Sequence, residues 1–153
     1  MSLKCNWVLI DELAVGPAPQ KNSDLIFLSN IGIKSIFRVC DDHEAPMFDN
    51  IDKLFNYRQF VLPDHKAEKL PSVFELQSAL TIINELRPFG PIYIHCLAGI
   101  ERSPLLCMAY LICFNKLPPD QALEYLLQVH PTTNPLPGQF KLLRNKRIDI
   151  FSK

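Results

Sequence analysis

The ten residues HCLAGIERSP at positions 95–104 lie between two apolar runs, and they indicate how the rest of the chain is arranged. Cys96 and Arg102 stand six positions apart with Gly99 between them, a spacing that allows one loop whose backbone N–H groups point at a common centre. Arg102 supplies a planar, permanently charged fork that can grip two oxygens of a phosphate. Pro104 suits the first turn of a helix, so a helix N-terminus would also face the anion. The segment therefore predicts a binding site for dianions.

The electrostatic field of such a loop also changes the expected chemistry of Cys96. Positive charge from Arg102, the backbone N–H groups and the helix N-terminus favours a thiolate over a thiol. We therefore expect Cys96 to be ionised near neutral pH and to act as a nucleophile. The alternative is an inert buried cysteine, which is a common state of this residue in proteins.

The order of the residues around Cys96 resembles a known family signature. The pattern HCxxGxxRS at positions 95–103 is similar to the signature of the cysteine-dependent protein tyrosine phosphatase superfamily, and its ending RSP looks most like the dual-specificity branch. A strand expected before the motif and a helix expected after it strengthen the match, because two residue types at one spacing recur by chance. The resemblance implies a protein phosphatase that hydrolyses phosphotyrosine, with phosphoserine and phosphothreonine as further candidates, through a phosphocysteine intermediate.

The resemblance also implies roles for individual residues of the motif. Cys96 would attack phosphorus with no metal required, while Arg102 and the loop N–H groups stabilise the equatorial oxygens. Ser103 would hydrogen-bond the cysteine sulfur and help it leave in the second step, and a plain helix-capping role is the alternative. His95 would position the loop, and its alternative is a core histidine with satisfied hydrogen bonds. The residues expected to bind the phosphate are Leu97, Ala98, Gly99, Ile100, Glu101 and Arg102.

The leaving oxygen needs a proton, and this calls for a carboxylic acid on a separate loop. The resemblance points to Asp64, which follows a strand-like run at residues 57–62 and sits where the family's mobile acid loop joins the next helix. Glu68, Asp41 and Asp42 are the alternatives for this role.

Two further residues have roles that only the resemblance suggests. In some relatives a cysteine at the position of Cys40 traps the oxidised nucleophile as a disulfide, and a core cysteine without a redox role is the alternative. Gln139 lies on a late loop that faces the active site in several branches, and it would orient the attacking water. A solvated glutamine at a helix start is the alternative for Gln139.

Composition limits the class of protein. A length of 153 residues fits one domain, so we expect residues 1–153 to form a single catalytic domain. The 16 Lys and Arg balance the 16 Asp and Glu, which provides no bulk charge for nucleic acid or a membrane surface. The N-terminus lacks signal-peptide features, and the longest apolar run is about half of a membrane span. The five cysteines are not spaced as in a disulfide-bonded scaffold, which fits a protein of a reducing compartment. We expect a soluble, cytoplasmic monomer without a metal or cofactor.

Segments of strand and helix character alternate along the chain. The expected strands cover residues 35–40, 57–62 and 91–94, after an edge hairpin within residues 7–15. The expected helices cover residues 23–30, 46–55, 71–86, 105–114, 118–129 and 139–151. This alternation predicts an α/β fold with a central, mainly parallel, twisted sheet and helices on both faces. Because sites in such sheets lie beyond the strand C-termini, Cys96, Cys40 and Asp64 would gather at one end.

The variable positions of the loop bear on the substrate. Leu97, Ala98, Ile100 and Glu101 add no lysine to the charge of Arg102, which argues against phosphoinositides. The chain also has no long tyrosine-bearing insert of the kind that deepens the pocket of strict tyrosine phosphatases. We therefore expect a shallower pocket, and a phosphoprotein or another phosphomonoester as the substrate.

Other classes of protein remain as alternatives. A catalytically weak phosphate-binding module, or pseudophosphatase, would keep the loop and dock phosphoproteins without a working acid. A rhodanese also uses an anion loop, but its loop needs no Arg-Ser ending. An arsenate reductase of the low-molecular-weight phosphatase type places the motif near the N-terminus, which position 96 contradicts.

Overall fold

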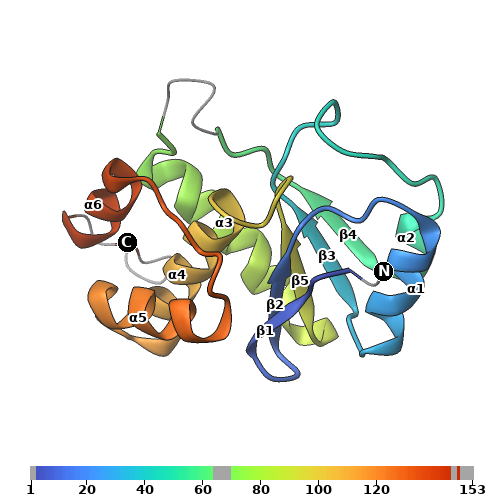
Figure 1. The fold of residues 1–153 in the computed structure, drawn as a ribbon, viewed down its shortest axis with the longest axis horizontal. Coiled ribbons are helices and arrows are strands. Elements are labelled where there is room, and N and C mark those ends of the chain that lie inside the picture. Colours follow the sequence, from blue (N-terminus) through green and yellow to red (C-terminus); the bar gives the residue numbers. More distant parts are fainter. Residues whose placement is uncertain (1–2, 64–69, 146–147, 149–153) are drawn as a thin grey trace.

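The computed structural model describes residues 3–63, 70–145 and 148, and it shows a sheet between two groups of helices (Figure 1). The strands within these residues are β1 (Asn6–Leu9), β2 (Leu13–Gly16), β3 (Ser35–Arg38), β4 (Asn56–Gln59) and β5 (Ile92–His95). The helices are α1 (Asn22–Asn30), α2 (Ile51–Leu54), α3 (Val73–Leu86), the 3₁₀ helix η2 (Arg87–Phe89), α4 (Arg102–Asn115), α5 (Pro119–Val129) and α6 (Pro137–Asn145). The strand order is β1-β2-β5-β3-β4, with β1 antiparallel to β2 and the other neighbours parallel. The mainly parallel α/β fold expected from the sequence is confirmed.

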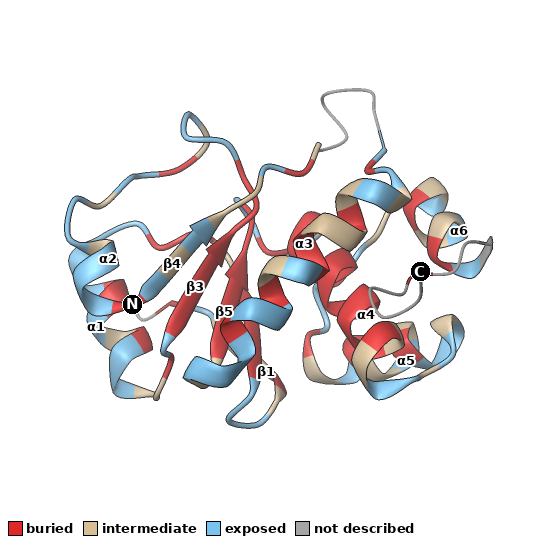
Figure 2. Cartoon of the chain, turned by 180° about the vertical axis from the view of Figure 1, so that it is seen from behind, coloured by how far each residue is buried: buried red, intermediate tan, exposed pale blue. Residues whose placement is uncertain are grey.

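Alternate residues of the central strands face opposite sides of the sheet, as the two-residue period of a strand requires. Ala14, Ile36 and Tyr93 pack with α1 in one core cluster, which also includes Leu25 and Leu28 of that helix. The intervening strand residues belong to a second cluster with α3 and α4, and these are Leu13, Val15, Phe37, Ile92 and Ile94. Helices therefore cover both faces, and Figure 2 shows the buried residues concentrated along the strands and α4.

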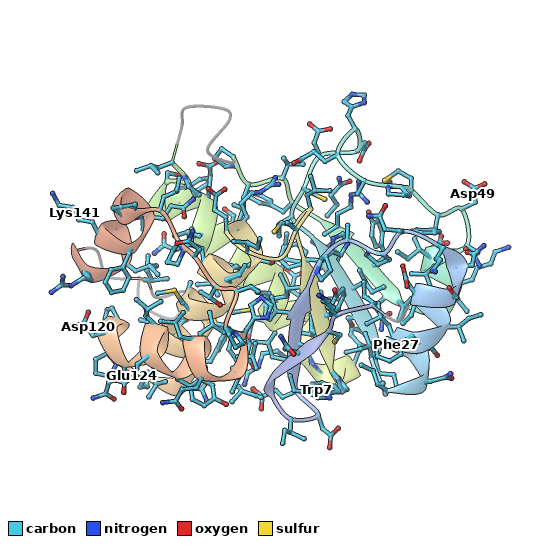
Figure 3. All side chains as sticks on the ribbon, viewed as in Figure 1. Trp7, Phe27, Asp49, Asp120, Glu124 and Lys141 are labelled. Carbon is cyan, nitrogen blue, oxygen red and sulfur yellow. The ribbon has the colours of Figure 1, made fainter. Side chains whose placement is uncertain are left out.

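The helices that carry the second core differ in how much of their surface is buried. In α4 every residue from Arg102 to Leu111 is buried, so this part of the helix is covered on all sides. In α5 the residues Ala122 and Leu126 are buried, whereas Asp120 and Glu124 point outward (Figure 3). α5 is thus an outer helix whose inner face packs against α4.

Side-chain hydrogen bonds stabilise the starts of two helices. Ser72 accepts a hydrogen bond from the Glu75 N–H at 3.0 Å, and the Glu75 carboxylate accepts one from the Ser72 N–H at 2.9 Å. This capping box begins α3. Asp24 caps α1 from within its first turn, accepting from the N–H groups of Gln20 at 2.8 Å and Lys21 at 3.3 Å.

Helix α2 is much shorter than the helix expected over residues 46–55, because it covers only Ile51–Leu54. The side chain of Arg38 donates hydrogen bonds to the backbone carbonyls of Asp41, Ala45 and Pro46, at 2.8 to 2.9 Å. Carbonyls held by a buried guanidinium are not available for helical hydrogen bonds. The apolar spacing after Pro46 is therefore used for packing in a loop rather than for a helix.

The parallel arrangement collects the functional loops at one end of the sheet. The segments after β2, β3, β4 and β5 all leave from the C-terminal ends of parallel strands, at the top of Figure 1. Within the described part of the chain, no helix combines the length and the apolar character needed to cross a membrane.

Candidate active site

The anion loop, defined here as residues 96–102, joins the end of β5 to the start of α4. Its tight course depends on Gly99, whose φ of 75° lies in the left-handed region. A Cβ atom at this position would lie 2.6 Å from the Gly16 carbonyl carbon and 2.8 Å from the Pro17 nitrogen. A glycine is therefore required here both for the backbone conformation and for the close approach of the segment after β2.

Five carbonyl groups of the anion loop point outward, toward donors that lie around the loop. Backbone N–H groups of Ala18, Asn134 and Leu105 donate to the carbonyls of Leu97, Ile100 and Glu101, at 2.9 to 3.0 Å. An imidazole nitrogen of His95 donates to the Cys96 carbonyl at 2.9 Å, and one of His130 donates to the Gly99 carbonyl at 2.6 Å. Among the described residues, the N–H groups of residues 97–100 have no protein acceptor. A loop whose carbonyls are held by hydrogen bonds and whose N–H groups lack acceptors can donate those N–H groups to a bound anion.

Cys96 and Ser103 lie together at the junction of the loop with α4. The Cys96 Sγ atom is 3.2 Å from the Ser103 Oγ atom, and the two residues are 3% and 0% exposed. A hydroxyl at this distance can donate a hydrogen bond to a thiolate. The geometry is that expected for Ser103 from the resemblance, and it also suits the first turn of α4.

Arg102 is held by a carboxylate that the sequence analysis did not single out. Its Nη2 and Nη1 atoms donate to the two oxygens of Glu44, at 2.7 and 3.0 Å. Arg102 is 4% exposed, and its Nη1 also lies 3.4 Å from the Leu62 carbonyl oxygen. The hydrogen bond from Arg102 is the main cause of the lowered pKa of Glu44, which is further lowered by a hydrogen bond from the Asp41 N–H. Glu44 thus stays ionised beside the anion loop and fixes the plane of the guanidinium.

Glu44 owes its position to Arg38, a 3% exposed arginine at the end of a buried strand. The three carbonyls that Arg38 binds flank Glu44 in sequence, so the guanidinium shapes the loop that presents this carboxylate. An arginine within the apolar run SIFRVC was the available sequence signal for such a role. Glu44 itself had no signal, because its partner lies 58 positions away.

His95 is neutral in the folded protein. Burial lowers its pKa to about 4, so the ring is uncharged at neutral pH. Its Nδ1 atom must carry the hydrogen, because the Cys96 carbonyl at 2.9 Å can only accept. The structure thus places the His95 ring against the first carbonyl of the anion loop, and its role in positioning the loop stays a prediction.

The other predicted site residues differ in where they lie. Asp64 and its alternative Glu68 fall outside the described residues. Asp41 and Asp42 are exposed and accept hydrogen bonds from the His43 N–H and the Gln59 side chain, within their own region. These two carboxylates stabilise a turn in the described part of the chain, and no contact there joins them to Cys96.

Gln139 and Cys40 are both completely buried. The Gln139 Oε1 atom accepts from the Leu136 N–H at 2.9 Å and so caps α6, and its buried Nε2 atom has no partner among the described residues. The alternative of a solvated glutamine is wrong, because packing around the start of α6 excludes solvent. Burial is the main cause that raises the pKa of Cys40 to about 11, and the charges of Arg102, Glu44 and Cys96 also act on it. Cys40 is therefore a thiol close to the anion loop.

A cysteine and a buried arginine on one anion loop, at the C-terminal end of a mainly parallel sheet, are the arrangement that the class of cysteine-dependent phosphatases uses. The catalytic-domain model of the dual specificity phosphatases matches residues 16–148 of this chain. The chain therefore belongs to the dual specificity phosphatase family, a branch of the cysteine-dependent, metal-independent phosphoric monoester hydrolases.

Relatives by sequence include dual specificity protein phosphatase 2 of Mus musculus, which is 29% identical over 74% of this chain and 34% of its own length. The phosphatidylglycerophosphate phosphatase PTPMT2 of Arabidopsis thaliana is 23% identical over 90% of this chain and 60% of its own length. The chain thus spans about a third of the mouse relative.

Relatives by structure include the human tyrosine phosphatase-like serine/threonine/tyrosine-interacting protein. It has a TM-score of 0.76 at 25% identity, covering 92% of this chain and 93% of the other. PTPMT1 in complex with PI(5)P has a TM-score of 0.79 at 17% identity, covering 92% of each chain, and this likeness concerns the fold.

The ion pair between Glu44 and Arg102 predicts a pH-dependent contribution to stability. Glu44→Gln should lower the free energy of unfolding at pH 7 by about 1 to 3 kcal/mol, because an amide offers Arg102 one acceptor oxygen in place of two and carries no charge to compensate the buried guanidinium. The folded-state pKa of Glu44 is lowered, so this contribution is present above the unfolded pKa of about 4.3. It should disappear as pH falls through the folded-state pKa. Urea unfolding at pH 7 and at pH 3 to 4 measures both effects.

The exposed pair of Arg58 and Glu85, 2.8 Å apart, provides the matched control. Glu85→Gln should change the unfolding free energy by less than about 0.5 kcal/mol, because both side chains are solvated. A Glu44→Gln effect of equal size at acid and neutral pH would show that the charge of the carboxylate is not its source.

Proposed function

We propose that this chain is a single phosphatase catalytic domain that hydrolyses phosphotyrosine in proteins, with phosphoserine and phosphothreonine as further substrates. The observation that carries this proposal is the anion loop, in which five carbonyls are hydrogen-bonded to donors around the loop while the N–H groups of residues 97–100 have no acceptor among the described residues. Cys96 and Arg102 belong to this loop, so a nucleophile and a phosphate-binding cation share one site. All five cysteines are free thiols, which fits a reducing compartment such as the cytoplasm.

The first step transfers the phosphoryl group to the protein. The Cys96 thiolate attacks phosphorus, a sulfur–phosphorus bond forms, and the bond from phosphorus to the ester oxygen breaks. Arg102 and the loop N–H groups stabilise the equatorial oxygens, on which the charge is spread. We assign the proton for the leaving oxygen to Asp64, on the basis of the family resemblance.

The second step releases phosphate. Water attacks the phosphocysteine, its proton passes to the carboxylate that donated in the first step, and the sulfur leaves as a thiolate. Ser103 is placed to hydrogen-bond that leaving sulfur, because its Oγ atom is 3.2 Å from the Cys96 Sγ atom. A water-orienting role for Gln139 stays a prediction, and the use of its Oε1 atom as a cap of α6 argues against it.

A lipid phosphate monoester is a second candidate substrate. The exposed side chains of the anion loop include Leu97 at 38% and Ile100 at 39%, so the entrance offers apolar contacts. Such an entrance suits one phosphate beside an apolar group and disfavours polyanions. The name of the Arabidopsis relative, a phosphatidylglycerophosphate phosphatase, points in the same direction. Comparing short-chain phosphatidylglycerophosphate with a phosphotyrosine peptide would rank the two classes.

Substitution of the nucleophile tests the proposed activity. Cys96→Ser should reduce hydrolysis of p-nitrophenyl phosphate at least about a thousand-fold, measured with a reductant and with EDTA. Cys5→Ser is the matched control, because Cys5 is partly buried and lies outside the anion loop. If no hydrolysis by the reduced protein depends on Cys96, the chain is a phosphate-binding module instead. Phosphopeptide binding to the Cys96→Ser protein would then be its remaining function.

A second substitution tests the general acid. Asp64→Asn should lower kcat by about 10²-fold or more for a phosphoserine peptide, and less for an aryl phosphate whose leaving group needs little protonation. The falling limb of the pH–rate profile should disappear at the same time. Glu68→Gln is the matched control, and a loss in this variant with none in Asp64→Asn would reassign the acid.

The position of Cys40 leads to a prediction about oxidation. Peroxide converts the Cys96 thiolate to a sulfenic acid, and attack by the Cys40 sulfur would form a disulfide and release water. Mass mapping after mild peroxide should find this Cys40–Cys96 crosslink, and Cys40→Ala should speed irreversible oxidation of Cys96. Burial raises the pKa of Cys40 to about 11, which slows the attack but does not prevent it. Absence of the crosslink would leave Cys40 as a core residue.

A further inference from the structure

His130 is a buried residue at the end of α5 whose two ring nitrogens are both engaged. It is 3% exposed, with Nε2 2.6 Å from the Gly99 carbonyl oxygen and Nδ1 2.7 Å from the Asn6 side-chain nitrogen. A carbonyl only accepts, so Nε2 carries the hydrogen, and Nδ1 accepts from the Asn6 amide. One tautomer, with the hydrogen on Nε2, therefore satisfies both of these contacts, and the Thr132 hydroxyl oxygen lies 3.3 Å from the same Nε2 atom.

The bond from His130 acts on one particular peptide unit of the anion loop. The Gly99 carbonyl and the Ile100 N–H belong to the same planar peptide group, so they point in opposite directions. Holding the carbonyl outward fixes the Ile100 N–H on the inner side of the loop. That N–H is one of those without a protein acceptor in the described structure.

The orientation of the Gly99–Ile100 peptide depends on such a hydrogen bond more than the orientation of the neighbouring peptides does. Gly99 has no Cβ atom and a φ of 75°, so its backbone can adopt alternative conformations at little cost. A rotated peptide would turn the carbonyl oxygen toward the bound anion and remove one donor from it. The result would be repulsion in place of attraction at the same point.

The turn after α5 is built to hold this imidazole in place. The Thr133 hydroxyl donates to the His130 carbonyl at 2.7 Å, and the Thr133 N–H reaches the same oxygen at 3.0 Å. The neighbouring Asn134 N–H donates to the Ile100 carbonyl at 2.9 Å. One short segment therefore holds two successive peptide units of the anion loop.

We propose that His130, held in its Nε2–H tautomer by Asn6, is a positioning residue that keeps the Ile100 N–H directed at the phosphate. Through it the edge strand β1 and the outer helix α5 control the anion loop, although neither touches the reacting atoms. This inference rests on the anion-binding role proposed above.

Binding of inorganic phosphate to the Cys96→Ser protein tests the proposal without requiring turnover. In isothermal titration, His130→Leu should weaken phosphate binding about tenfold, the effect of losing one good hydrogen bond to the anion. His130→Gln should bind within about threefold of the parent, because its amide can donate to the Gly99 carbonyl. Asn6→Leu should give an intermediate loss, because the tautomer is no longer fixed.

Tyr125→Phe separates this role from general packing. The Tyr125 hydroxyl donates to the Val8 carbonyl, so it also joins α5 to β1 but does not touch the loop. This variant should bind phosphate like the parent. Failure of the parent to bind phosphate would overturn the anion site itself, whereas equal affinity in the parent and a folded His130→Leu would overturn only the role of His130.

The tautomer gives an independent measurement that does not depend on whether a variant folds. Long-range ¹H–¹⁵N NMR spectra of the parent should show the His130 Nε2 atom protonated and Nδ1 unprotonated. A protonated Nδ1 with a bare Nε2 would overturn the proposal, because that ring could not donate to the Gly99 carbonyl.

Discussion

The outward hydrogen bonding of the loop carbonyls is the constraint on which the candidate site depends. A peptide group is rigid, so each carbonyl that is tied to a surrounding element leaves its partner N–H facing the opposite way. Donors for these carbonyls come from the segment after β2, from the end of β5, from α4 and from the turn after α5. Elements far apart in the chain therefore build the anion site together. The sequence of the loop alone is therefore not sufficient to form the site.

A second constraint concerns the buried charge of Arg102. A guanidinium that is 4% exposed needs a compensating charge, and Glu44 provides it through two hydrogen bonds. Glu44 in turn needs the loop shape that Arg38 imposes on the backbone carbonyls around it. The Arg102 side chain is thus oriented before a phosphate binds, so binding requires less reorganisation of that side chain. The cost is a negative charge close to the site.

Sequence patterns predicted those parts of the fold that depend on local chemistry. The motif around Cys96, the alternating strands and the capping box at Ser72 each follow from residues within a few positions of one another. Glu44 and His130 were not found, because their partners lie 58 and 31 positions away. The helix expected over residues 46–55 was too long for a different reason: Arg38 binds the carbonyls of Ala45 and Pro46, and the spacing of apolar residues does not reveal that contact.

The balance of charges also limits how the site attracts its substrate. The chain has a formal net charge of zero, so long-range steering of an anion is weak. Glu44 beside Arg102 reduces the local positive charge further, and the exposed loop residues Leu97 and Ile100 add none. Affinity must then come from several N–H groups that converge on a single phosphate. A site of this kind discriminates by the shape and number of phosphates more than by total charge. Its selectivity therefore depends on every peptide unit of the anion loop keeping its orientation.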